Sequence, residues 1–225
     1  GITTSEIDKL CYQYINDHKA YSAPLYYRGY PKSCCTSSNH VVCHGIPSEK
    51  ILYDGDVINV DVTAIKDGWH GDTSRMFIVG ECSIKAKKLI KVTYDSMMKA
   101  IKTIKANTKI GNIGYTIQKI VEAEGFSVVR DFCGHGIGKK FHESPNVLHY
   151  GEKDSGQELK EGMIFTVEPM INSGKFETKT LKDGWTAVTK DKSLSAQFEH
   201  TVGVTKEGYE IFTLSKKSLN FPPNL

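Results

Sequence analysis

The chain has 225 residues, of which 39% are hydrophobic and 24% are charged, a composition typical of a globular protein with a substantial core. Its formal net charge is +3, from 29 basic and 26 acidic residues, and this excess is too small to predict nucleic-acid binding. No apolar run has the length of a membrane span, and the first residues lack the basic start and apolar stretch of a signal peptide.

Six cysteines are scattered along the chain, and no two have the C-x-x-C spacing. A zinc site built from such a thiolate pair is therefore excluded. The irregular spacing in a long chain favours free thiols and a cytoplasmic location over a disulfide framework. The cysteines are Cys11, Cys34, Cys35, Cys43, Cys82 and Cys133.

The N-terminal segment predicts a helix followed by an irregular stretch. Thr3 or Thr4 provides a side chain that can cap the helix. Apolar residues then recur at helical spacing from Ile7 to Tyr14. Residues 22–47, rich in Tyr, Ser, Cys and Gly, are expected to be irregular.

A β-hairpin and a long basic helix are expected next. Residues 57–65 alternate as in a strand, Asp67-Gly68 is typical of a two-residue turn, and a second strand runs from about residue 69 to 79. Residues 83–106 have a helical apolar stripe. Lysines occupy the other faces of this helix, which favours a solvated surface and, as a second hypothesis, a contact with the ribosome. These lysines are Lys85, Lys87, Lys88, Lys91, Lys99, Lys102 and Lys105.

The two-residue turn fixes the pairing of the hairpin strands. It places Thr63 opposite Asp72 and Asp61 opposite Ser74. Asp61 and Asp72 are then diagonal neighbours on one face of the sheet, about 7–8 Å apart or less. Two carboxylates at that separation repel each other unless a cation lies between them, so the pairing indicates a metal site.

The chain repeats itself weakly but in a constant order. The matched segments are residues 1–10 with 111–120, 44–46 with 135–137, 54–61 with 160–168, and 71–73 with 198–201. Four matches in order predict a duplicated helix, loop and hairpin unit, with halves of about 1–92 and 93–225 within one domain spanning 1–225. Glu168 and Glu199 then correspond to Asp61 and Asp72.

Two hairpins that face each other would bring the four carboxylates together. Either His44 or His135 could add a nitrogen ligand, and the residues alone do not decide between them. Carboxylate and imidazole ligands suit Mn, Fe, Co or Zn, and a two-metal site can activate a water. A single strand Asp could instead be a buried, hydrogen-bonded residue, but four acids at duplicated positions argue for metal binding.

Other classes of enzyme fit the sequence poorly. The glycines around His135 allow close approach, but they do not form G-x-G-x-x-G, and no phosphate-loop lysine follows. There is no G-x-S-x-G motif, and His142-Glu143 is not followed by the second His of H-E-x-x-H. Cys43 and His44 are neighbours that point to opposite faces of a strand, which makes them a poor catalytic dyad.

Six motifs closely resemble those of type I methionine aminopeptidases, with a similarity that runs from Gly1 to about Gly208. The resemblance implies an α/β (α+β) pita-bread fold with pseudo-twofold symmetry, its two halves arranged around a curved antiparallel sheet. It also implies hydrolytic removal of the initiator methionine from nascent proteins whose second residue is small. The motifs are Val42-Cys43-His44-Gly45-Ile46-Pro47, Asn59-Val60-Asp61-Val62-Thr63, His70-Gly71-Asp72-Thr73-Ser74, Gly134-His135-Gly136-Ile137-Gly138, Thr166-Val167-Glu168-Pro169-Met170 and Gln197-Phe198-Glu199-His200-Thr201.

The resemblance also implies the roles of the site residues. Asp72 and Glu199 would bridge two divalent ions (Co, Mn, Fe or Zn), and a water between the ions would attack the first peptide bond. His44 and His142 would face the substrate, and Glu168 would carry the proton. The implied metal ligands are Asp61, Asp72, His135, Glu168 and Glu199.

The same resemblance implies an aromatic pocket for the methionine side chain, whose thioether packs well against rings. Pro24 departs from the family pattern, because many bacterial relatives carry a small or thiol residue there. Such enzymes also usually carry a helix ahead of Gly1. The pocket residues implied are Tyr27, Tyr30, Cys35, Phe141 and Trp185.

Two alternatives share this fold. One is a proline-directed aminopeptidase or dipeptidase, which usually has a large additional N-terminal domain. The other is a binding module that has lost catalysis, and such modules usually lack some of the ligands. All five implied ligands are present here, so the sequence favours an enzyme that acts on peptides. The resemblance implies a monomer, and no membrane partner is expected.

Overall fold

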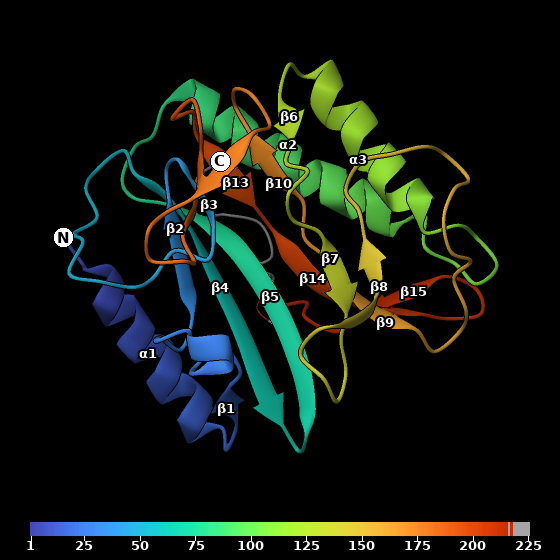
Figure 1. The fold of residues 1–225 in the computed structure, drawn as a ribbon, viewed down its shortest axis with the longest axis horizontal. Coiled ribbons are helices and arrows are strands. Elements are labelled where there is room, and N and C mark those ends of the chain that lie inside the picture. Colours follow the sequence, from blue (N-terminus) through green and yellow to red (C-terminus); the bar gives the residue numbers. More distant parts are fainter. Residues whose placement is uncertain (216, 218–225) are drawn as a thin grey trace.

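A curved antiparallel sheet with helices packed around it forms the molecule, which is described here from a computed structural model covering residues 1–215 and 217 (Figure 1). None of the helices in that part of the chain has both the length and the apolar character needed to cross a bilayer. The α-helices are α1 (Thr4–Asp17), α2 (Ile84–Ile101) and α3 (Gly111–Ala123), and a 3-10 turn, η1, covers Tyr27–Gly29.

The main sheet contains nine strands in the order β1-β4-β5-β14-β9-β7-β8, with β2 paired to β4 and β15 paired to β14. Its strands are β1 (Tyr21–Ser22), β2 (Cys35–Ser38), β4 (Val57–Lys66), β5 (Trp69–Ile78), β7 (Gly134–Gly136), β8 (Glu143–Val147), β9 (Ile164–Val167), β14 (Glu199–Val204) and β15 (Tyr209–Ile211).

Two smaller sheets complete the strand arrangement, one in the order β13-β10-β6 and one in the order β11-β12-β3. Their strands are β3 (Val41–Cys43), β6 (Ser127–Val128), β10 (Met170–Asn172), β11 (Thr178–Thr180), β12 (Ala187–Thr189) and β13 (Ser195–Gln197). Figure 1 shows α2 and α3 side by side, with α1 at the opposite edge beside β1.

The first helix begins where its capping signal predicts. The Thr3 side chain accepts a hydrogen bond from the backbone N–H of Glu6, and the Glu6 carboxylate accepts one from the backbone N–H of Thr3 at 2.7 Å. This reciprocal capping box satisfies two donors at the helix start. Of the two threonines considered as caps, Thr3 therefore performs this role.

Two of the predicted boundaries were wrong. The basic helix expected over 83–106 ends at Ile101, because the N–H groups of Thr103 and Ile104 bond only three residues back and the Thr103 hydroxyl bonds to the carbonyl of Ala100 at 2.7 Å. The stretch 22–47 contains β2 and β3 rather than irregular chain alone. All four residues of β2 are buried, so this strand has no alternating pattern to detect.

The first hairpin has the predicted register. Thr63 lies opposite Asp72, and Asp61 lies opposite Ser74. Both residues of the Asp67-Gly68 turn have positive φ, 52° and 79°, as a type I′ turn requires. This turn determines which residues of β4 and β5 share a face.

The second pair of acidic strands differs from the prediction. It is not a hairpin, because β10 to β13 intervene along the chain between β9 and β14. Nor do two hairpins face each other: β14 pairs directly with β5, with Glu199 opposite Ser74, so all four strands lie in one curved sheet. The expected boundary between residues 92 and 93 falls inside α2.

The helices α2 and α3 bury their apolar faces in the main core. On β9, Phe165 and Val167 belong to this core, as do Val202 and Val204 on β14. Successive side chains of a strand point to opposite faces. Glu168, which directly follows β9, and Glu199, the first residue of β14, therefore face away from the helices.

We expect Ile117→Ala, in the core of α3, to lower the free energy of unfolding by about 2–5 kcal/mol, because it leaves a cavity. The Ile117 side chain is 0% exposed. The matched control is Ile84→Ala, at a position that is 87% exposed in α2, and it should change stability by less than about 0.5 kcal/mol. Urea unfolding measures both. Equal losses in the two variants would contradict this assignment of the core.

Candidate metal centre

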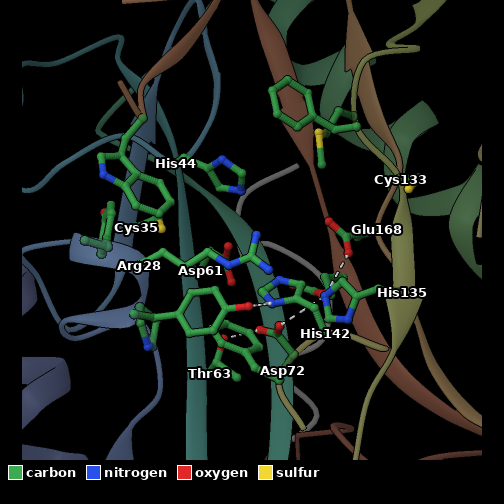
Figure 2. A pocket seen from close by; sticks show the side chains of 18 of the residues that line it. Arg28, Cys35, His44, Asp61, Thr63, Asp72, Cys133, His135, His142 and Glu168 are labelled. Atoms are coloured by element: carbon green, nitrogen blue, oxygen red, sulfur yellow. Dashed lines mark hydrogen bonds and ion pairs between the residues drawn. The ribbon is translucent and has the colours of Figure 1, made fainter. Parts of the chain in front are cut away.

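Four carboxylates from the main sheet line one cavity of about 630 Å³. Asp61 and Asp72 lie within β4 and β5, Glu199 is the first residue of β14, and Glu168 directly follows β9. Figure 2 shows Asp61, Asp72 and Glu168 directed toward the same space as His135. The four acids that the repeat related to one another are therefore brought together.

His135 reaches this space because glycines flank it on β7. A Cβ at Gly134 would overlap with the carbonyl oxygen of Thr166 on β9, and one at Gly136 would overlap with that of Ser144 on β8. Glycine is therefore needed at both positions for the strands to approach this closely. The sequence-based interpretation of this glycine-rich run is correct at these two positions.

The ligand atoms lie at distances suited to holding a cation. The Nε2 atom of His135 is 3.8 Å from Oδ2 of Asp72 and 3.6 Å from Oε1 of Glu168. Potential ligand atoms of Asp72, His135 and Glu199 all lie within 4.8 Å of one another. The Oδ1 atom of Asp61 is buried and has no hydrogen-bond partner. An orphaned buried oxygen beside clustered acids fits a site built for a metal.

Burial changes the titration of all four acids. It is the largest cause that raises the pKa of Asp61 to about 7 and that of Glu168 to about 8, and a neighbouring carboxylate adds to each shift. The pKa values of Asp72 and Glu199 are also raised by burial and then by neighbouring acids. Within residues 1–215, none of the four makes an ion pair with Lys or Arg. A bound cation would supply the missing countercharge.

Two threonines hold Asp72 in place. The Thr63 hydroxyl donates to Oδ1 of Asp72 at 2.7 Å. The Thr201 hydroxyl accepts from the Asp72 N–H at 3.0 Å and donates to the Asp72 carbonyl at 2.8 Å. These bonds fix Asp72 from both neighbouring strands, β4 and β14.

A second set of contacts fixes Glu168. The Thr166 hydroxyl donates to Oε1 of Glu168 at 2.7 Å and accepts from the backbone N–H of His135 at 3.0 Å. The backbone N–H of Glu168 donates to Nε2 of the buried His149 at 3.1 Å, and Gln197 donates to Oε2 at 3.3 Å. Burial lowers the pKa of His149 to about 3, so this ring stays neutral and able to accept.

These supporting residues were not predicted from the sequence. The threonines do leave a signal there, because each lies two residues from an acid and so on the same face of its strand. His149 and Gln197 leave no such signal, because only the fold brings them to Glu168. The threonine and acid pairs are Asp61 with Thr63, Thr166 with Glu168, and Glu199 with Thr201.

The structure distinguishes the histidines that the sequence left equivalent. His135 lies among the carboxylates, whereas His44 lies apart from them beside the ring of Phe132, 5.5 Å away between centroids (Figure 2). No hydrogen bond to the His44 ring is found among the described residues. His142 lines the cavity, and its Nδ1 is 3.0 Å from the Tyr27 hydroxyl. Burial and then nearby His135 lower the pKa of His142 to about 3.

The expected aromatic residues also line the cavity, together with Pro24. The Tyr30 hydroxyl is directed away, since it donates to the carbonyls of Cys34 and Gly45 at 3.0 Å each. The Tyr30 and Trp185 rings meet edge to face at 5.2 Å. Further lining residues were missed because no pattern marks them, among them Arg28, Phe132, Cys133 and Met170.

Comparison with known proteins agrees with this geometry. Residues 1–206 match the model of metallopeptidase family M24. The methionine aminopeptidase of Rickettsia prowazekii is 59% identical over 224 residues, which cover 99% of this chain and 86% of that protein. The methionine aminopeptidase of Escherichia coli K12 is 57% identical, over 96% and 83% of the two chains.

A solved structure matches as closely in fold. The methionine aminopeptidase of Thermotoga maritima superposes with a TM-score of 0.93 at 39% identity, covering 95% of this chain and 86% of that one. The pita-bread fold expected from the resemblance is thus confirmed. The chain belongs to metallopeptidase family M24 and, within it, to the methionine aminopeptidases.

Proposed function

We propose that this enzyme removes the N-terminal methionine from nascent proteins whose second residue is small. The main support for this proposal is that a cluster of carboxylates and histidines and a set of aromatic residues line the same cavity. The cluster suits metal-assisted hydrolysis, and the aromatic pocket suits a thioether. Relatives named methionine aminopeptidase at 57–59% identity favour this activity over a proline-directed one and over a non-catalytic module.

The metal cluster would hold two divalent ions of the group Co, Mn, Fe and Zn, because its ligands are mixed oxygen and nitrogen. Asp72 and Glu199 would be among the residues that hold these ions. The ions would supply Lewis-acid activation of a water and of the first peptide carbonyl. The proposed ligands are Asp61, Asp72, His135, Glu168 and Glu199.

The remaining groups of the chain bind the substrate and move the proton. Glu168, held by Thr166 and His149, takes a proton from the attacking water and passes it toward the leaving amine. Tyr27 orients the neutral His142 ring, and the His44 ring has no hydrogen-bond partner within residues 1–215, so both rings can bind the substrate backbone. The methionine side chain lies against the pocket residues Tyr27, Tyr30, Cys35, Phe141 and Trp185.

A monomer in the cytoplasm is proposed as the working form. The six cysteines are free thiols, as expected in a reducing compartment. The proposed substrate is a peptide, wherever the enzyme acts. A ribosome contact through α2 is a separate part of this proposal.

Metal should restore methionine release in protein that a chelator has stripped. Mn, Fe, Co and Zn are added separately, and free methionine is measured from Met-Gly-Ser and Met-Leu-Ser peptides. We expect at least about 100-fold higher kcat/KM for the Met-Gly peptide, because the larger residue is excluded next to the metal centre. Equal rates for both peptides, or no release with any metal, would contradict the proposal.

The metal-free protein should lose stability as pH rises from 7 to 8.5. Asp61 and Glu168 keep protons in the folded state up to pKa values of about 7 and 8, whereas the unfolded chain releases them near pH 4. The folded state therefore binds more protons, and the free energy of unfolding falls with pH, by about 1–2 kcal/mol. Buried histidines act in the opposite direction only below their unfolded pKa of 6.5, outside this window.

Thermal unfolding with chelator measures this effect. Asp61→Asn should make the fall shallower, and Asp67→Asn in the exposed turn is the matched control that should not. Bound metal should remove the pH dependence. A melting temperature that rises over this window in the chelated protein would show that the acids are not buried as described.

The ribosome proposal rests on lysines of α2 and its C-terminal end that have no acidic partner. Lys85, Lys99 and Lys102 are exposed and make no ion pair among the described residues, whereas several neighbouring lysines do. Replacing these three lysines by Glu reverses their charge and should weaken co-sedimentation with ribosomes at low salt by about 10-fold or more. Reversing Lys19, Lys153 and Lys182 outside α2 is the matched control. Unchanged co-sedimentation of the α2 variant would exclude the contact.

A further inference from the structure

Arg28 is the only lysine or arginine among the described residues that line the cavity. Its side chain is exposed, and Figure 2 shows it extending into the space between Asp61 and His142. The two acids lining the cavity outside the metal cluster, Asp131 and Glu143, do not pair with it. No ion pair involving Arg28 occurs among residues 1–215. The cavity therefore presents a guanidinium whose charge the protein leaves unmatched.

The backbone around Arg28 is unusual. Arg28 has φ 48° and Tyr26 has φ 66°, both in the left-handed region that bulky residues rarely adopt. Hydrogen bonds hold this turn closed, from Tyr26 N–H to the Tyr30 carbonyl at 2.7 Å and from Gly29 N–H to the Tyr26 carbonyl at 3.2 Å. Strained backbone of this kind clusters at binding sites. A residue suited to the conformation, such as Asn or Gly, would lack the charge.

Contacts of the Arg28 side chain direct its charge toward the reacting end of the cavity. The guanidinium carbon lies 5.3 Å from the centroid of the Tyr27 ring, and Tyr27 in turn bonds to His142. The guanidinium is thus close to a residue that binds the substrate in the proposed function.

The path of a bound peptide through the cavity indicates which substrate residue lies near Arg28. The aromatic end of the cavity is closed, with Tyr30 2% exposed and Cys35 7% exposed, whereas Arg28 and His142 are exposed. A chain whose methionine side chain lies inward must leave past this exposed side. Its second residue is small in the proposed function and carries no charge. The third residue is then the first whose side chain can carry a carboxylate. Because one residue spans only about 3.3–3.6 Å, the third residue lies close behind the second.

We propose that Arg28 forms a subsite for an acidic side chain at the third residue of the substrate. The inference rests on the proposed function, because it takes the methionine position from it. A guanidinium binds carboxylates through two parallel hydrogen bonds. The subsite makes the enzyme prefer Asp or Glu at the third position and disfavour Lys or Arg there.

Three matched peptides test the subsite: Met-Gly-Asp-Ser, Met-Gly-Asn-Ser and Met-Gly-Lys-Ser, each amidated at the C-terminus. For the metal-loaded enzyme at low salt, kcat/KM for the Asp peptide should exceed that for the Lys peptide by about 5-fold, with the Asn peptide between them. The ratio should fall toward 1 in 0.5 M salt, because an exposed charge pair is screened.

Variants assign the preference to Arg28. Arg28→Gln should bring the Asp to Lys ratio to about 1, Arg28→Glu should invert it, and Arg28→Lys should keep part of it. The control is Lys139→Gln, which removes one positive charge from an exposed residue outside the cavity, stacked on Trp69, and should leave the ratio unchanged. A wild-type ratio near 1, or the same ratio in Arg28→Gln, would overturn the proposal.

Failure of the proposed function gives a different result. In that case no peptide is cleaved, and the calorimetric affinities of the same peptides for the metal-loaded protein decide the role of Arg28. Tighter binding of the Asp peptide in wild type, lost in Arg28→Gln, supports the subsite. Equal affinities of the three peptides, or none, contradict it.

Discussion

The mutual repulsion of four buried carboxylates is the constraint on which the rest of the site depends. Asp61, Asp72, Glu168 and Glu199 lie in one cavity without a lysine or arginine partner among the described residues. Such an arrangement is unstable unless protons or cations neutralise it. The sheet holds it together by backbone pairing of β5 with β14, and the Thr201 hydroxyl bonds both backbone polar groups of Asp72 across that junction.

The two histidines that the predicted repeat relates to each other, His44 and His135, have different surroundings in the structure. His135 lies on a strand between glycines, so its ring can enter the carboxylate cluster. His44 follows β3 with φ 56°, in a left-handed turn that directs its ring toward Phe132 instead. In the proposed function, His135 would face the metal ions and His44 would stay free to contact the substrate.

The sequence predicted those parts of the site that depend on local rules. The register of β4 and β5 follows from the Asp67-Gly68 turn, and it correctly placed Asp61 and Asp72 on one face. The pairing of β14 with β5 joins residues 125 positions apart, Ser74 and Glu199, and no local pattern encodes it. For the same reason His149 was missed: it is one buried histidine among others until the fold places it against the backbone of Glu168.

In the proposed function, the bonded Tyr30 hydroxyl would help the pocket to select an apolar side chain. The Tyr30 hydroxyl is bonded to two backbone carbonyls, so its ring presents only an apolar edge to Trp185 and the pocket. A polar side chain entering there would lose its water and find no partner among these rings, which is unfavourable. A thioether loses little on leaving water and gains ring contacts. We therefore expect this part of the cavity to disfavour polar side chains by desolvation, while the proposed metal cluster stays polar.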